Sequence, residues 1–169
     1  MKYVGMCCVL AACIWMGQYY SAGAARRIRA LEQILLLLGL INSELAYCRT
    51  PVRELMRHIM RHGELSELPF LQLCGRMCEQ GVAFPSAWSR ALKRQCAERT
   101  LRREDISLLQ AFGTQLGTTD LEGQLSLCGL YARLFEERLS QAREWKNKYA
   151  KLYTSLGVLG GLLIWILFL

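Results

Sequence analysis

Hydrophobic and polar positions divide the chain into two apolar ends and a charged middle. Charge-free stretches cover residues 3–25 and 152–169, and nearly all charged residues lie between them. At about 1.5 Å per residue, these stretches would form helices of roughly 35 Å and 27 Å, against a bilayer hydrocarbon core of about 30 Å. Each stretch therefore predicts a transmembrane helix.

Between the ends, apolar residues recur at the three- and four-residue steps of a helix. The first such segment continues the first apolar stretch as far as Cys48. Its apolar positions indicate one buried face, made of Ile28, Leu31, Ile34, Leu35, Leu38, Ile41 and Leu45. The uncharged part between Glu32 and Glu44 has only eleven residues, which is too short to cross a bilayer. We expect a core helix here.

Proline, glycine and capping residues divide the rest of the middle into shorter helices. Thr50 and Pro51 predict a helix start, and Gly63 predicts its end. The same punctuation predicts helices at residues 69–80, 85–98 and 103–116.

A last, long helix is expected from Leu121, with Thr119 and Glu122 as its capping box. Its apolar residues alternate steps of four and three, which predicts a seam along another long helix. The seam consists of Leu125, Cys128, Ala132, Phe135, Leu139 and Ala142. The helix that ends at Cys48 is its simplest partner.

The expected architecture is all-α. A six-helix bundle covers residues 26–151, and its first and last helices extend into transmembrane spans at residues 1–25 and 152–169. Only Lys2 precedes the first span, whereas cations cluster at the inner ends of both spans: Arg26, Arg27, Arg29, Arg138, Arg143, Lys146, Lys148 and Lys151. The positive-inside rule then places the bundle in the cytoplasm, where the eight cysteines should stay reduced.

Two other interpretations of the N-terminal stretch would place the middle of the chain outside the cytoplasm. The residues Ala22-Gly23-Ala24 fit the small-residue cleavage site of a secretory signal peptide. The residues before Cys13 fit a lipoprotein signal, although Ile14, Trp15 and Met16 continue the apolar run beyond it. In either case, the cysteines would be read as a disulfide set.

The net charge of +7 owes much to the cations beside the spans, whose natural counterpart is the anionic lipid headgroup. No nucleic acid is needed to explain it. Away from the spans, the strongest basic patch has Glu98 as its one acidic residue and comprises Arg90, Lys93, Arg94, Arg99, Arg102 and Arg103. This basic surface is either a solvated helix face or a docking site for an acidic partner surface or lipid headgroups.

Candidate chemistry is sparse. His58, His62, Cys74 and Cys78 form two pairs at four-residue spacing, which can place two metal ligands on each of two helix faces. This spacing is less diagnostic than a two-residue cysteine knuckle, and His62 also suits a helix C-terminus. The sequence lacks a phosphate-binding glycine-lysine loop and offers no serine in a nucleophile-elbow context. We therefore expect no enzyme activity, no metal and no cofactor. The alternative function is a membrane-bound metal-binding protein that uses these two histidines and two cysteines.

Small residues share a face within each predicted span. Gly157 and Gly161 are four residues apart in the second span, and Cys13, Gly17 and Ser21 have the same spacing in the first. Small residues let helices approach closely in lipid, within the chain or between copies of it. Glycine is also frequent in membrane helices, so incidental placement is an equal alternative.

Several segments resemble one protein family. These are residues 31–51, with Ser43-Glu44-Leu45-Ala46-Tyr47 leading into Thr50-Pro51, the terminal residues 155–161, and a motif made of Phe112, Gly113, Leu116, Gly117, Asp120 and Gln124. Together they resemble the stage III sporulation protein AB family, although its members are not typically rich in cysteine. The motif itself favours a structural turn, in which one helix ends and the next begins.

The resemblance implies a component of the channel between mother cell and forespore. The bundle would then be similar to the helical domains of inner-membrane platform proteins of type II secretion and type IV pilus machines. Such proteins couple a cytoplasmic ATPase to membrane components, so the expected partners are the ATPase of the same apparatus and other channel proteins, with a second copy of this chain as a further candidate. The expected location is the mother-cell side of the outer forespore membrane.

Overall fold

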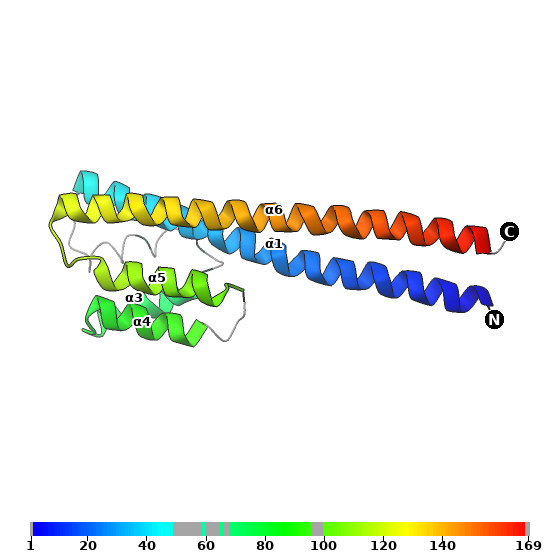
Figure 1. The fold of residues 1–169 in the computed structure, drawn as a ribbon. Coiled ribbons are helices and arrows are strands. Elements are labelled where there is room, and N and C mark those ends of the chain that lie inside the picture. Colours follow the sequence, from blue (N-terminus) through cyan, green and yellow to red (C-terminus); the bar gives the residue numbers. More distant parts are fainter. Residues whose placement is uncertain (1, 49–58, 60–64, 66–67, 96–99, 168–169) are drawn as a thin grey trace. The chain divides into compact units, whose positions relative to one another are not determined.

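The computed structural model describes the backbone of residues 2–48, 59, 65, 68–95 and 100–167. Over these residues the chain is all-helical, with five helices and no strand (Figure 1): α1 Lys2–Cys48, α3 Pro69–Glu79, α4 Phe84–Gln95, α5 Arg103–Gln115 and α6 Leu121–Leu167. The sixth predicted helix, between Thr50 and Gly63, lies outside the described residues except for Ile59, which is helical and buried.

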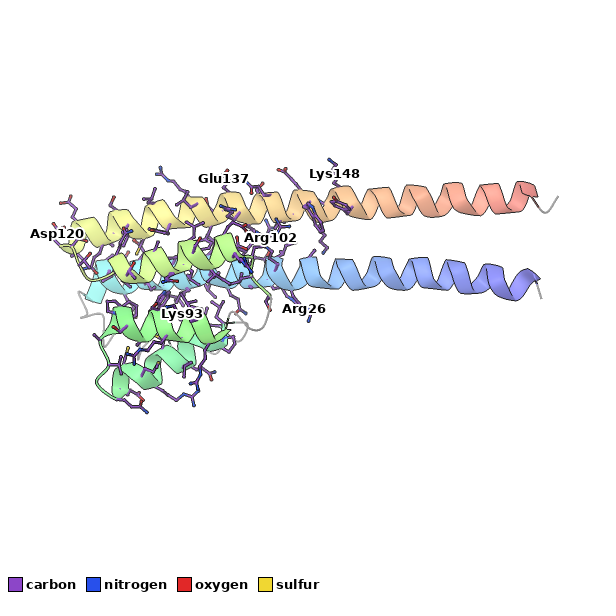
Figure 2. The ribbon with its side chains drawn as sticks, turned by 60° about the horizontal axis from the view of Figure 1, so that its bottom comes forward. Arg26, Lys93, Arg102, Asp120, Glu137 and Lys148 are labelled. Atoms are coloured by element: carbon purple, nitrogen blue, oxygen red, sulfur yellow. The ribbon has the colours of Figure 1, made fainter. Side chains whose placement is uncertain are left out.

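Two compact units make up the chain, and α1 and α6 contribute to both. The terminal unit consists of Met1–Ile28 with Ser140–Leu169, and the bundle unit of Arg29–Leu139. Within each unit, the α1 segment runs beside the α6 segment (Figures 1 and 2). Among the residues whose side chains the structure describes, the buried apolar ones other than Ala142 all lie in the bundle unit.

The C-terminal half of α1 forms one wall of the bundle unit. Leu31, Ile34, Leu38 and Ile41 are at most 1% exposed, as their helical spacing predicts. Among the residues whose side chains are described, Gly23–Tyr47 is the one helix long and apolar enough to be a candidate membrane span. Because its apolar face is already buried in protein, we interpret this stretch as the core helix that the sequence predicts.

A series of contacts between aromatic rings connects the remaining helices of the bundle unit. The Trp88 ring on α4 contacts Phe70 on α3 at a centroid separation of 5.0 Å and Phe112 on α5 at 6.2 Å. Phe112 in turn lies 5.4 Å from the Tyr131 ring on α6. Such edge-to-face pairs add packing specificity to the area that the rings bury. The four helices therefore share one core.

Two glycines end helices where the sequence predicts. Gly81 after α3 has φ +87° and Gly117 after α5 has φ +84°. A side chain at either position would be strained in this left-handed conformation, so glycine suits both turns.

The start of α6 corrects the predicted capping box. Asp120, not Thr119, is the capping residue, because its Oδ1 accepts a hydrogen bond from the Gly123 backbone N–H at 3.2 Å. The helix begins at Leu121, so the third helical residue is Gly123, and Glu122 is out of register for a capping box with Thr119. An anion here also complements the helix dipole.

Candidate functional site

The exposed face of α4 carries the first half of the basic surface. Arg90, Lys93 and Arg94 are all exposed. The opposite face of the same helix is buried and consists of Ala87, Trp88, Ala91 and Leu92. Lys93 and Arg94 lie in the last turn, where cations complement the helix dipole, so they have a local structural role as well.

The second half lies at the start of α5. Arg102 and Arg103 are exposed. At this end of a helix the dipole is positive, so two arginines do not favour helix formation. The fully buried Asp105 offsets this, because its carboxylate accepts a hydrogen bond from the Arg102 backbone N–H at 3.1 Å. Arg102 therefore has a local role in the cap of α5, whereas Arg103 lies where a cation does not complement the helix dipole.

The antiparallel packing of α4 and α5 brings these two halves to the same end of the bundle unit (Figure 1). Figure 2 labels Lys93 on α4 and Arg102, which directly precedes α5. Of the other predicted members of the basic surface, Arg90 lies on α4 and Arg103 begins α5, whereas Arg99 lies outside the described residues.

A close helix contact fixes α4 against α5. The Trp88 indole N–H donates a hydrogen bond to the Leu109 carbonyl at 2.8 Å, and the Gln110 amide donates to the Ser89 hydroxyl at 3.4 Å. Trp88 also lies directly on the backbone of Gly113, where a Cβ would overlap the indole ring. The basic surface is thus mounted on a rigid helix pair.

The predicted family motif falls on this same framework. Phe112 and Leu116 are buried, Gly113 accommodates Trp88, and Gly117 makes the turn. The motif's last two polar members, Asp120 and Gln124, both bond at the start of α6, since the Gln124 amide donates to the Thr119 carbonyl at 2.8 Å. Each of these contacts has a structural role, which agrees with the interpretation of the motif as a turn.

Only two of the four predicted metal ligands lie among the described residues. Cys74 and Cys78 are buried on α3, whereas His58 and His62 lie outside the described residues. Burial raises the pKa of the Cys74 thiol, and the neighbouring Cys78 raises it further. Within the described part of the chain, no group of three or more metal-ligating side chains comes together. A thiol held protonated by its surroundings is a poor metal ligand.

The glycines Gly157 and Gly161 lie within helix α6. The side chains around them are outside the described residues, so their proposed packing role stays a prediction.

The position of Trp88 is the feature that the sequence analysis missed. Among the buried residues of α4 it is the one aromatic side chain, and it lies between the small residues Ala87 and Ala91. Two features of the sequence could have indicated this contact. They are a large aromatic residue in a short helix and a glycine inside a later helix.

The fold and this surface define a class: over the described residues, an all-helical protein with two long helices, α1 and α6, and an exposed basic surface on a rigid helix pair. The family model for stage III sporulation protein AB matches residues 2–169, so the chain belongs to that family. This membership places it among sporulation proteins.

A curated relative has the same description. Stage III sporulation protein AB of Bacillus subtilis (strain 168) is 24% identical over 168 residues, which cover 99% of this chain and 98% of that protein. No solved structure matches the chain.

Proposed function

We propose that this chain is a non-enzymatic membrane platform of the sporulation channel, and that it couples a cytoplasmic ATPase to membrane components. The bundle unit would bind the ATPase through the basic surface. The two apolar ends would span the membrane and hold the bundle in the cytoplasm, on the mother-cell side of the outer forespore membrane.

The observation that carries this proposal is the exposed cation set at one end of the α4–α5 pair. Arg103 lies in the first turn of α5, where a cation does not complement the helix dipole, so the dipole does not explain its position. Clustered, exposed cations on a rigid support attract an acidic protein surface and orient it during binding. The large aromatic side chains beneath them are buried and leave the charges as the accessible feature.

The membrane part of the proposal rests on the sequence pattern and on helix continuity. Helix α1 runs from Lys2 through the first apolar stretch, and α6 runs to Leu167 through the second. Cations follow the first stretch and precede the second, as expected for inner ends that contact anionic lipid headgroups. Other channel proteins, or a second copy of the chain, would contact the spans.

Binding to the ATPase of the same apparatus tests the proposal. The full chain, held in lipid nanodiscs, should bind the purified ATPase. The fourfold variant Arg94→Gln, Arg99→Gln, Arg102→Gln and Arg103→Gln should weaken binding at least about fourfold, because each exposed charge pair contributes about 0.2 to 1 kcal/mol. The measurement is surface-based binding at low and at physiological salt.

A control neutralises two exposed arginines elsewhere on the bundle unit. Arg76 on α3 and Arg133 on α6 are exposed, and the double variant Arg76→Gln, Arg133→Gln should bind as tightly as the unchanged chain. Equal affinity of the fourfold variant and the unchanged chain would show that the ATPase does not use the basic surface.

A further inference from the structure

Between residues 33 and 47, the exposed side of α1 in the bundle unit carries no charged side chain. The one charged residue in this range, Glu44, is half-buried. Five exposed residues, spaced three or four positions apart, form what we call the outer face of α1: Leu36, Gly39, Ser43, Ala46 and Tyr47. Among the described residues, each other helix of the bundle unit has exposed charged side chains. The outer face therefore differs from a normal solvated helix face.

Two large side chains on this face lie in solvent. Leu36 is 37% exposed and Tyr47 is 86% exposed. The opposite side of the same helix is buried in the bundle core, with Ile34, Leu38 and Ile41 at most 1% exposed. Helix α1 is thus apolar on the side that the bundle covers and uncharged on the side that it leaves open.

Gly39 lies at the centre of the outer face and has no packing role within the chain. Nothing lies within 4 Å of the position that its Cβ would occupy. A glycine inside a helix lowers helix stability relative to alanine, so the position is unfavourable for α1 alone. What glycine provides is a surface that another helix can approach closely.

The chemistry of the outer face makes it complementary to itself. The hydroxyls of Ser43 and Tyr47 each donate and accept hydrogen bonds, so each can pair with the same group of a second copy. A two-fold axis brings residues of one copy close to their equivalents in the other, where charged residues would repel each other. An uncharged face with a leucine, a glycine and two hydroxyls avoids that repulsion. A second copy of the chain therefore fits the face.

Membrane anchoring aligns two copies for this contact. If both apolar ends span the bilayer, copies in one membrane have the same orientation, and a two-fold axis along the membrane normal relates them. Their α1 helices then run in the same direction, with Gly39 of one copy near Gly39 of the other. The face is about 17 Å long, and confinement to one membrane raises the effective concentration of each copy, which favours so small a contact.

We infer that the outer face of α1 is a dimer contact between two copies of the chain, with Gly39 where the two helices cross. This inference rests on the proposed function only for the two membrane spans. It involves neither the ATPase nor the basic surface, which lies on α4 and α5.

Photo-crosslinking tests which surface faces a second copy. The purified full chain in lipid vesicles carries p-benzoylphenylalanine in place of Tyr47, an aromatic residue at the edge of the face. Irradiation should give a covalent dimer. The matched control carries the same probe in place of Leu130, which is 56% exposed on α6, and should give several-fold less dimer.

Like charge across the contact should break it. In vesicles that contain copies with donor or acceptor dyes on an N-terminal tag, energy transfer measures the dimer. The variant Ser43→Glu should weaken the dimer at least about tenfold, because it places two carboxylates near the two-fold axis. The matched control Ser126→Glu, at an exposed position of α6, should retain the energy transfer of the unchanged chain.

A pair of glycine substitutions tests the close approach of the helices. Gly39→Leu should reduce energy transfer several-fold, since the added side chain holds the two helices apart. Gly129→Leu on α6 is the matched control, because nothing lies near its Cβ position either. Both variants should unfold in urea at no lower concentration than the unchanged chain, which shows that the loss is not one of folding.

Flotation separates this inference from the proposed function. A chain that floats with the vesicles but gives no dimer by either method overturns the contact and leaves the membrane anchor standing. Equal cross-linking from positions 47 and 130, or equal loss in Ser43→Glu and Ser126→Glu, also overturns it. So does a cross-link in sporulating cells from position 47 to a different protein in place of a second copy. A chain that does not float would overturn the spans and the dimer contact together.

Discussion

At the scale of single residues, the contact between Trp88 and Gly113 has the greatest influence on the candidate site. The indole ring occupies the space of a side chain at position 113 and bonds to the Leu109 carbonyl. This one residue pair sets how closely α4 approaches α5. The basic surface depends on it, because its two halves lie on those two helices.

Substituting Gly113→Ala should therefore destabilise the protein, although alanine favours helices. The added Cβ would overlap the Trp88 indole ring, and overpacking of this kind costs about 1 to 3 kcal/mol. Urea unfolding of the full chain in mild detergent measures the change in free energy of unfolding. Gly129 on α6 is the control, since nothing lies near its Cβ position, and Gly129→Ala should stabilise by about 0.5 to 1 kcal/mol. Equal effects of the two substitutions would contradict the contact.

The buried thiols predict how stability changes with pH. Burial raises the pKa of Cys128 to about 11 from the ordinary value of 9.0. The folded state holds this thiol protonated while the unfolded chain ionises it, so the stabilising contribution is complete below pH 9 and is lost as the pH rises towards 11. Unfolding of the full chain at pH 8 and pH 10 should show this decrease.

The variant Cys128→Ala removes the titrating group and is the comparison for that experiment. Its free energy of unfolding should fall less between pH 8 and pH 10 than that of the unchanged chain. An identical fall in both chains would assign the alkaline sensitivity to other groups.

At the scale of helices, the sequence predicts well which segments are helical, because each helix boundary has a local cause. Pro69 begins α3, Gly81 follows it, and Gly117 follows α5, as the punctuation indicates. The seam of α6 is buried at Cys128, Phe135 and Leu139. These features depend on residues within a few positions of one another, so they can be read without knowledge of the fold.

Features that depend on distant residues were not predictable in the same way. Trp88 bonds to a carbonyl 21 residues away, and no local pattern specifies that partner. Likewise, four exposed arginines and one lysine of the basic surface could be named from the sequence, but their meeting at one end of the α4–α5 pair follows from the packing of that pair. The one-residue error at the start of α6 arose because Thr119 and Asp120 are both good capping residues.

Two substitutions at the start of α6 distinguish the observed cap from the predicted one. Asp120→Ala removes the oxygen that accepts the Gly123 N–H and should cost about 1 kcal/mol of stability. Thr119→Ala should cost less than about 0.5 kcal/mol, since the Thr119 backbone carbonyl, which accepts a hydrogen bond from the Gln124 amide, is retained. Urea unfolding of the full chain compares them, and a larger loss for Thr119→Ala would restore the predicted capping box.

At the scale of the whole molecule, membership of the stage III sporulation protein AB family and the exposed basic surface point towards one proposal. A helical protein with apolar ends and a charged middle can link a cytoplasmic motor to a membrane. In this account, the bundle unit provides the docking surface and the terminal unit provides the anchor. Both roles require the middle of the chain to face the cytoplasm.

The most direct measurement of this central claim is the location of the turn between α5 and α6. A short strand of a split fluorescent protein can be inserted after Thr118, which lies in an exposed turn. In sporulating cells, the remaining fragment expressed in the mother-cell cytoplasm should restore fluorescence at the membrane that surrounds the forespore. Fluorescence restored only by a fragment exported across the membrane would contradict the account.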